Sequence, residues 1–95
     1  MARHLPPLSM LRAFEATSRL SSVSRAAAEL GRTHGAISKQ LKTLQSDFGA
    51  PLFDRAGTGL RPNATGLRLA ALVAEALDRL ATGYEALHRD RKSVV

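Results

Sequence analysis

The sequence has 95 residues, which is enough for one domain with a modest core but too few for a separate catalytic domain. It contains no cysteine, which excludes a disulfide framework and a thiolate metal site, and its three histidines lack the spacing of metal ligands. The formal net charge is +6. Residues 1–62 contain nine lysines and arginines and four acidic residues, whereas residues 63–95 contain five lysines and arginines and four acidic residues. A net charge of this size alone indicates only a well-solvated surface. The excess of positive charge lies in residues 1–62, however, and together with the helical motif in that region it favours a polyanionic partner.

Two helices are predicted in the N-terminal part of the chain. Residues 1–7 are expected to form an irregular arm, because two consecutive prolines cannot lie inside a helix. A first helix is predicted over about residues 8–19. Its apolar stripe consists of Leu8, Leu11 and Phe14, with Ala16 beside it. Ser22 is a suitable N-cap for a second helix over residues 23–30. Arg25, in the first turn of that helix, is either a phosphate contact or an ordinary surface arginine.

A tight turn joins the second helix to a third, and this pair is the central motif of the chain. Gly31 accepts the left-handed conformation that ends a helix, and Thr33 is a good N-cap for a helix over residues 33–48. One face of that helix is apolar at helical spacing and consists of Ile37, Leu41, Leu44 and Phe48. The opposite face carries His34, Gly35, Ser38, Lys39 and Lys42. This arrangement is typical of a helix-turn-helix whose second helix reads DNA.

A small hairpin is predicted after the third helix, which ends at Gly49 and which Pro51 prevents from resuming. Residues 52–62 contain a short apolar strand, a glycine-rich tip and a second strand closed by a proline. After a helix-turn-helix, such a hairpin is typical of a wing that lies along the DNA backbone or enters the minor groove. Arg55 and Arg61, on either side of the tip, favour a wing over a simple connector.

A long final helix is predicted over about residues 64–91, with Asn63 as its N-cap. It carries apolar residues at the spacing of a coiled-coil seam. This seam consists of Leu69, Val73, Ala76, Leu80 and Leu87 and is flanked by Ala70, Leu77 and Tyr84. The predicted dimer interface comprises the seam together with Leu77 and Tyr84. A small three-helix core can cover the start of the seam but not its far end, so the second half is expected to pack against another copy of the chain. The alternative is a helix that folds back and is covered within one chain.

Together these segments resemble the N-terminal DNA-binding domain of LysR-type transcriptional regulators, over residues 5–87. LPPLSMLRAFEAT is similar to the first-helix signature of the subgroup with LPPL and RAFEA, and SSVSRAAAEL is similar to the family's S-F-T-R-A-A-x-x-L. THGAISKQLKTLQSDFGAPLFDR is similar to S-Q-x-A-[LV]-S-x-Q-I-x-x-L-E-x-x-L-G-x-x-L-F-x-R. The matching positions are Ala36, Ser38, Gln40, Leu44, Gly49, Leu52, Phe53 and Arg55. NATG, at residues 63–66, stands where the family has L-T-x-A-G.

The resemblance implies a mainly α fold, with a winged helix-turn-helix over residues 1–62 and a linker helix over residues 63–95 that mediates dimerisation. The wing would occupy about residues 52–62. It also implies binding of double-stranded promoter DNA by a homodimer, on interrupted palindromes with T- and A-rich ends, and a tetramer in a full-length regulator. A small-molecule effector would act only through a C-terminal domain that this chain lacks, so we expect either a piece of a longer regulator or a naturally short protein. No cofactor and no metal are expected.

Four residues depart from the family pattern. Arg32 stands in the turn where a buried Val or Ile is common, so its side chain is expected to extend to the surface or reach a phosphate. His34 replaces a common glutamine; a glutamine contacts adenine through two hydrogen bonds, whereas a histidine gives one at a time. Gly35 replaces a proline or small residue and lets the backbone come near DNA. Thr58 stands where the wing often has arginine, which weakens the expected minor-groove contact.

The sequence therefore predicts two sets of DNA contacts. The recognition helix, residues 33–48, is expected in the major groove, where Lys39 is favoured over Lys42 for a guanine edge. The predicted base-contacting residues are His34, Gly35, Ser38, Lys39 and Lys42. The predicted backbone-contacting residues are Arg25, Arg32, Thr33, Arg55, Thr58 and Arg61. Gln40 is expected to hold a contact between helices rather than to reach a base.

Catalysis is not expected, because the sequence has no nucleophile elbow, phosphate-binding glycine loop, metal cluster or paired carboxylates. Ser38 beside His34 is a one-turn helical pair without an acid to orient the imidazole. The alternative function is a protein-interaction module, since winged helices and long amphipathic helices also serve as assembly platforms. The N-terminus lacks the apolar core of a signal peptide, and no stretch has the apolar length of a membrane span. We therefore expect a cytoplasmic, nucleoid-associated protein without membrane contact.

Overall fold

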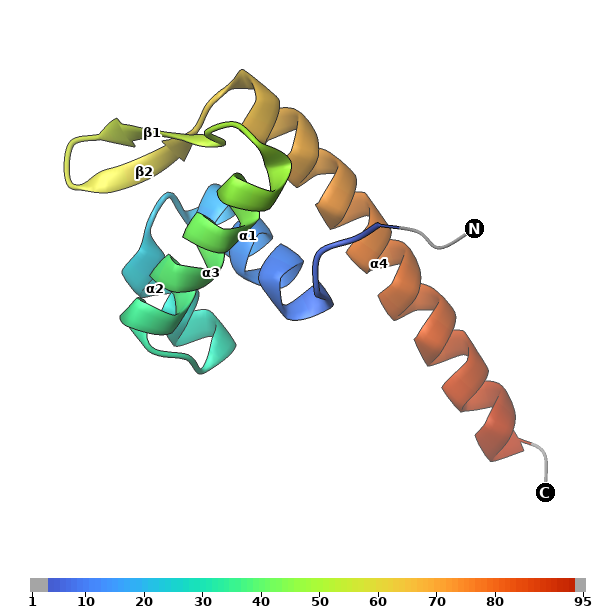
Figure 1. Cartoon of the computed structure of the whole chain (residues 1–95). Helices are drawn as coiled ribbons and strands as arrows, with labels where there is room; N and C mark the ends of the chain where they lie inside the picture. The colour runs from blue at the N-terminus through green and yellow to red at the C-terminus, as the bar shows by residue number, and fades with distance from the viewer. Residues whose placement is uncertain (1–3, 94–95) are drawn as a thin grey trace.

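Six elements follow one another in a computed structural model of the chain, which describes residues 4–93. They are α1 (Leu8–Leu20), α2 (Val23–Leu30), α3 (His34–Phe48), β1 (Phe53–Ala56), β2 (Gly59–Pro62) and α4 (Ala64–Ser93). The three short helices pack together, the antiparallel hairpin β1–β2 projects from one side of them, and α4 runs away toward the C-terminus (Figure 1). The predicted winged helix-turn-helix with a long C-terminal helix is confirmed. Residues 4–7 are irregular, while the rest of the predicted arm, residues 1–3, lies outside the described residues.

The helix ends follow local chemistry. The hydroxyl of Ser22 accepts a hydrogen bond from the Arg25 N–H at 3.1 Å, and the hydroxyl of Thr33 accepts one from the Ala36 N–H, also at 3.1 Å. These bonds confirm both predicted N-caps. Gly31 ends α2 with φ 65°, a left-handed conformation that glycine adopts at little cost. Gly31 and Thr33, the two residues predicted from the sequence to form the turn, therefore define the connection between α2 and α3.

The core is formed where α1, α2 and α3 meet beneath the hairpin. Its largest fully buried apolar side chains are Phe14, Ile37, Leu44 and Leu52. Ala26 and Ala27 of α2 are also buried, and their small side chains let α3 pack closely across that helix. Phe14 meets Phe53 of β1 edge-on, with ring centroids 5.4 Å apart, so the hairpin is anchored to α1.

Two residues of the predicted apolar stripes are not in this core. Leu8 is 52% exposed and Phe48 is 48% exposed, so membership of an apolar stripe does not place either residue in the core. Leu8 is the first residue of α1 and Phe48 the last of α3, where the helices extend past the packed centre. Both line a groove of about 500 Å³ between the N-terminal arm, α1, α3 and α4.

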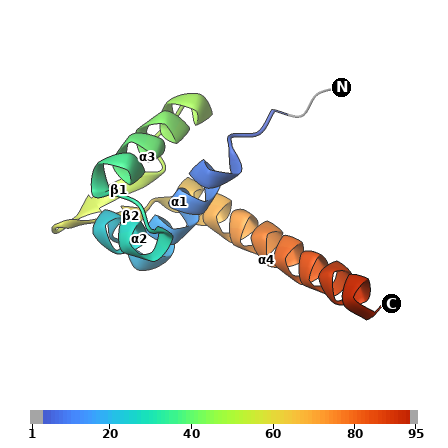
Figure 2. The same cartoon turned by 90° about the horizontal axis from the view of Figure 1, so that it is seen from below.

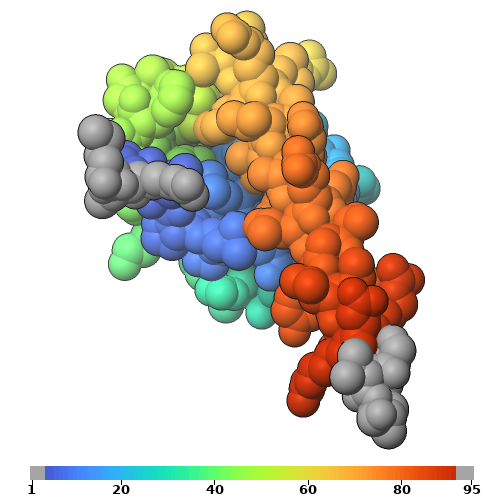
Figure 3. Space-filling view, turned by 90° about the vertical axis from the view of Figure 1, so that its right-hand side faces the viewer, coloured from blue at the N-terminus to red at the C-terminus, as the bar shows by residue number. Residues whose placement is uncertain are grey.

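The long helix α4 is covered only at its start. Val73 is buried and Leu69 packs against the core, whereas Leu80, Tyr84 and Leu87 are 59%, 75% and 71% exposed. Figures 2 and 3 show α4 leaving the helical body and extending beyond it. The predicted division of the seam into a covered start and an uncovered far end is confirmed, and full coverage within one chain is excluded. Among the described residues, no helix combines the length and apolarity needed to cross a membrane.

Candidate nucleic-acid interface

The start of α3 presents a polar and cationic surface. Its inward residues are buried, and this fixes which residues face outward. His34, Gly35, Lys39 and Lys42 are exposed, and Ser38 is half-buried at the edge of the same face. The five predicted base-contacting residues therefore lie on one side of one helix. Their contact with bases stays a prediction.

A polar hollow of about 210 Å³ lies where the starts of α2 and α3 face the hairpin. His34 and Ser38 line it from α3, Arg55 and Thr58 line it from the hairpin, and Ser24 lines it from the first turn of α2. The fold thus brings residues of both predicted sets to one place. Sequence reasoning missed Ser24 as part of this surface, although a serine in the first turn of a helix next to the recognition helix was an available signal.

The two hairpin arginines point in different directions. Arg55 is paired with Leu60 and Asp54 with Arg61 in the antiparallel register. Because directly opposite residues share a face and neighbours alternate, Arg55 and Arg61 lie on opposite faces of the hairpin. Both are exposed, but only Arg55 lines the hollow beside α3. The hairpin therefore presents Arg55 to the recognition helix, whereas Arg61 lies opposite Asp54 on the other face.

The remaining predicted backbone contacts lie near the turn between α2 and α3. Arg25 is exposed in the first turn of α2, and Thr33 is exposed while its hydroxyl caps α3. Arg32 is exposed and lines a small hollow with Arg12 of α1. This confirms that Arg32 reaches the surface rather than the core; its contact with a phosphate stays a prediction.

Gln40 has the structural role that the sequence predicts. Its Nε2 donates a long hydrogen bond, 3.4 Å, to the Ser9 hydroxyl of α1. The bond joins the recognition helix to the first helix and points the amide away from the outer face of α3.

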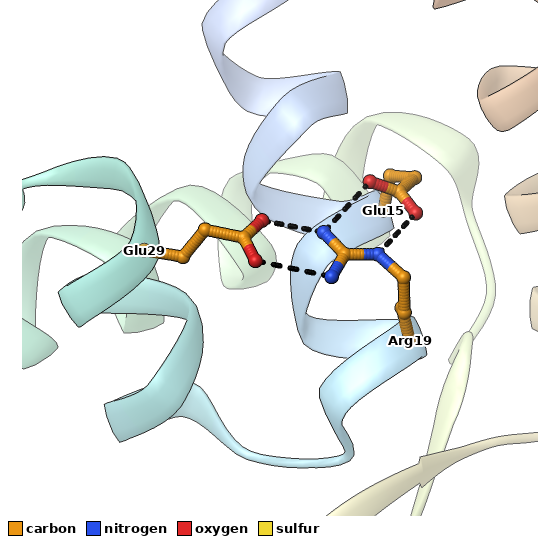
Figure 4. Close-up of polar contacts among 3 residues, drawn as sticks. All are labelled: Glu15, Arg19 and Glu29. Atoms are coloured by element: carbon orange, nitrogen blue, oxygen red, sulfur yellow. Dashed lines mark hydrogen bonds and ion pairs between the residues drawn. The ribbon is translucent and has the colours of Figure 1, made fainter.

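An arginine bridge joins α1 to α2, which the sequence did not predict. Arg19 Nε donates to Glu15 Oε2 at 3.0 Å on its own helix, and Arg19 Nη1 donates to Glu29 Oε1 at 3.0 Å on α2 (Figure 4). The Arg19 guanidinium keeps the pKa of Glu29 below its usual range, and the two carboxylates raise the pKa of Arg19. Ten residues of sequence separate Arg19 from Glu29, so only the crossing of the two helices brings them together.

Glu29→Gln is expected to make the fold less sensitive to acid. Because Arg19 lowers the pKa of Glu29 from its ordinary value of 4.5, the pair stabilises the fold above that value, and this contribution is lost as the pH falls through the lowered pKa. The urea midpoint of the wild type should therefore drop more between pH 7 and pH 3 than that of the variant. Glu75→Gln, at an exposed glutamate of α4, is the control. Identical pH profiles for the two variants would show that the bridge contributes nothing.

No group of three or more potential metal ligands occurs within residues 4–91, the range whose side chains the structure describes.

Residues 8–67 match the family model of the bacterial regulatory helix-turn-helix proteins of the lysR family. The HTH-type transcriptional regulator TrpI of Pseudomonas aeruginosa is 48% identical to this chain over 80 residues, which are 84% of this chain and 27% of TrpI. The HTH-type transcriptional activator AmpR of Citrobacter freundii is 42% identical over 81 residues, which are 85% of this chain and 28% of AmpR. The chain thus spans little more than a quarter of the length of these relatives.

Solved structures have the same fold. The DNA-binding domain of BenM, in complex with catB site 1 DNA, superposes with a TM-score of 0.82 at 21% identity, covering 88% of this chain and 93% of that chain. A probable transcriptional regulator from Pseudomonas aeruginosa superposes with a TM-score of 0.80 at 35% identity, covering 86% of this chain and 28% of that chain. Both likenesses cover more than four fifths of this chain.

Proposed function

Because this chain belongs to the lysR family of bacterial regulatory helix-turn-helix proteins, we propose that it binds double-stranded promoter DNA and regulates transcription. Residues 1–62 are the DNA-binding unit, and residues 63–95 are the dimerisation helix. The observation that carries the proposal is the outer face of α3, which begins with exposed small, hydrogen-bonding and cationic residues. The names of TrpI and AmpR as transcriptional regulators, and the DNA in the BenM complex, support it.

The recognition helix α3 lies in the major groove. A helix of this diameter fits that groove, and its N-terminal turn comes nearest to the base edges. His34 and Ser38 offer single hydrogen bonds. Gly35 faces open space, since a Cβ there would meet no atom of the protein within 4 Å, and its lack of a side chain allows the backbone to approach DNA closely. Lys39 donates to a guanine edge, and Lys42 lies one turn further on the same side.

The backbone contacts surround this helix. Arg55 and Thr58 reach a phosphate from the hairpin, and they share a polar hollow of about 210 Å³ with His34 and Ser38 of α3. Arg25, Arg32 and Thr33 hold phosphates from the turn side, and Arg61 holds one from the other face of the hairpin, along the backbone or in the minor groove. These contacts set the register and contribute affinity with little sequence preference.

Two copies pair through the uncovered part of α4. The exposed interface residues Ala76, Leu80, Tyr84 and Leu87 meet those of a partner, with Leu77 beside them. Leu69 packs on the chain's own core and Val73 is buried within the chain, so these two predicted interface residues lie at the covered end, next to the part of α4 that pairs. The dimer reads an interrupted palindrome, and half-site spacing follows from dimer geometry. In a full-length regulator, dimers assemble as tetramers and a C-terminal domain binds the small-molecule effector.

The experiment that tests the function separates DNA binding from protein assembly. The chain is applied to heparin and then mixed with an AT-rich duplex in a gel-shift assay. A DNA-binding module elutes from heparin only at high salt and retards the duplex. Early elution together with no retardation at about 100 μM protein would contradict the proposal, since even non-specific DNA binding has dissociation constants of about 10⁻⁴–10⁻⁶ M.

Arg55→Ala is expected to weaken binding to every duplex alike and to make binding less sensitive to salt. Removal of one phosphate-binding cation reduces the steepness of log K against log salt by about 0.9. Arg61→Ala, on the opposite face of the hairpin, should change the slope in the same direction but by less, because Asp54 lies across from it. The slopes are measured by fluorescence anisotropy between low and physiological salt. An unchanged slope would remove the substituted arginine from the phosphate contacts.

A further inference from the structure

The peptide between Pro51 and Leu52 is held from two sides at the junction of the recognition helix, the hairpin and α4. Leu52 immediately precedes β1, and its side chain is fully buried in the core. Its N–H and its carbonyl are both hydrogen-bonded to residues of other elements or their caps. A segment without regular structure is thus immobilised at its backbone as well as through its side chain.

From the recognition helix, Gln45 holds this segment. Its Nε2 donates to the Leu41 carbonyl one turn earlier at 3.2 Å, and this bond fixes the orientation of the amide. Its Oε1 accepts a hydrogen bond from the Leu52 N–H at 2.8 Å. The last turns of α3 are thereby joined to the strand that begins the wing.

From the start of α4, Asn63 holds the same segment with two groups and caps its own helix with a third. Its backbone N–H donates to the Leu52 carbonyl at 3.0 Å, and its side-chain Nδ2 donates to the Pro51 carbonyl at 2.8 Å. Its Oδ1 accepts from the Gly66 N–H at 2.8 Å, which caps α4. The same side chain therefore begins the long helix and ties it to the end of the α3–β1 connection.

We propose that Gln45 and Asn63 are positioning residues, which clamp the Pro51–Leu52 peptide and thereby fix the direction in which α4 leaves the recognition helix. Neither residue belongs to the predicted DNA-contacting surface. α4 packs on α1 and β2, and through the Pro51–Leu52 peptide the hydrogen bonds of the clamp connect the start of α4 to α3. A fixed direction of α4 also fixes the separation of the two recognition helices in a dimer. This consequence rests on the dimer of the proposed function.

The clamp can be opened without removing the helix cap. Asn63→Ser keeps a side-chain oxygen for the Gly66 N–H but is too short to donate to the Pro51 carbonyl. Gln45→Met keeps the length of the side chain and removes both hydrogen bonds, whereas Gln45→Glu keeps the acceptor for Leu52 and serves as the conservative control. Circular dichroism establishes that each variant is folded, and Asn63→Ser carries the test if Gln45→Met does not fold.

The first readout is a distance within one chain. Because the protein has no cysteine, Thr43→Cys on α3 and Thr82→Cys on α4 accept two spin labels without competing sites. Pulsed electron paramagnetic resonance is recorded with labelled chain diluted in unlabelled chain. One narrow distance is expected for the wild type and for Gln45→Glu, and a broader or shifted distribution for Asn63→Ser and Gln45→Met. A wild-type distribution in folded Asn63→Ser would overturn the proposal.

The second readout is the preferred half-site spacing, which a decrease in stability alone would not alter. Palindromic duplexes with half-sites moved together or apart are compared, and the wild type should prefer one spacing by about tenfold. Asn63→Ser should bind an isolated half-site as the wild type does but distinguish the spacings by about twofold or less. An unchanged spacing preference would refute the clamp. A wild type with no spacing preference would instead refute the dimeric function and the consequence drawn from it, while the intramolecular distance would still decide the clamp.

Discussion

Gly66→Ala is expected to lower the free energy of unfolding by about 3 kcal/mol, at the upper end of the cost of overpacking a well-packed site. Gly66 is buried in the first turn of α4. A Cβ at this position would overlap the Leu52 carbonyl oxygen and would lie 3.2 Å from the Pro62 Cβ. The obstacle is backbone, and the clamp described above holds that backbone in place. Relief therefore requires a shift of α4 away from the body, which urea denaturation followed by circular dichroism should detect as a lower midpoint.

Gly83→Ala is the matched control in the same helix. A Cβ at this position meets nothing within 4 Å, and the backbone is helical, so the higher helix propensity of alanine should leave stability unchanged or raise it by up to about 1 kcal/mol. The two variants add the same methyl group to the same helix, but only Gly66→Ala is expected to lower the free energy of unfolding. Equal effects would show that the close approach at Gly66 is not rigid.

Lys39→Ala is expected to reduce the preference for the specific palindrome over a scrambled duplex by about 10- to 100-fold, the range for removing one good base contact. Lys39 is exposed on the outer face of α3, where its side chain would reach a guanine edge in the major groove. Binding to the scrambled duplex should change much less, because that affinity comes from phosphate contacts. The measurement is a pair of anisotropy titrations at one salt concentration.

Lys42→Ala provides the comparison for Lys39→Ala. It removes the same charge from the same face of α3, so it controls for the decrease in general electrostatic attraction. If Lys42 holds a flanking phosphate, its removal weakens both duplexes alike. The assignment of Lys39 to a base fails if Lys39→Ala also lowers specific and scrambled affinity by the same factor.

Local signals in the sequence predicted most of the fold. Ser22, Thr33 and Asn63 are N-caps because their side chains reach the N–H groups of the turn that follows, and this depends on neighbouring residues only. The spacing of Ile37 and Leu44 likewise determined which face of α3 is exposed. The sequence alone therefore predicted the order of all six elements and most of the residues that make up the candidate interface.

Contacts that depend on how helices and strands cross in space could not be predicted from local sequence signals. Arg19 meets Glu29 only because α1 and α2 cross, and Gln45 meets Leu52 only because the chain turns back after α3. The register of the hairpin, which places Arg55 and Arg61 on opposite faces, depends on which residues form the two-residue tip. Periodicity also fails at helix ends such as Leu8, where a residue has the right phase but no neighbour to cover it.

The most direct test of DNA recognition by a dimer is a salt-dependent binding titration with light scattering on the same sample. A duplex carrying an interrupted palindrome with T- and A-rich ends is compared with a scrambled duplex of the same composition. We expect tight binding by a dimer, a clear preference for the palindrome, and an affinity that falls steeply with salt. Equal, weak binding of both duplexes by a monomer would contradict this expectation.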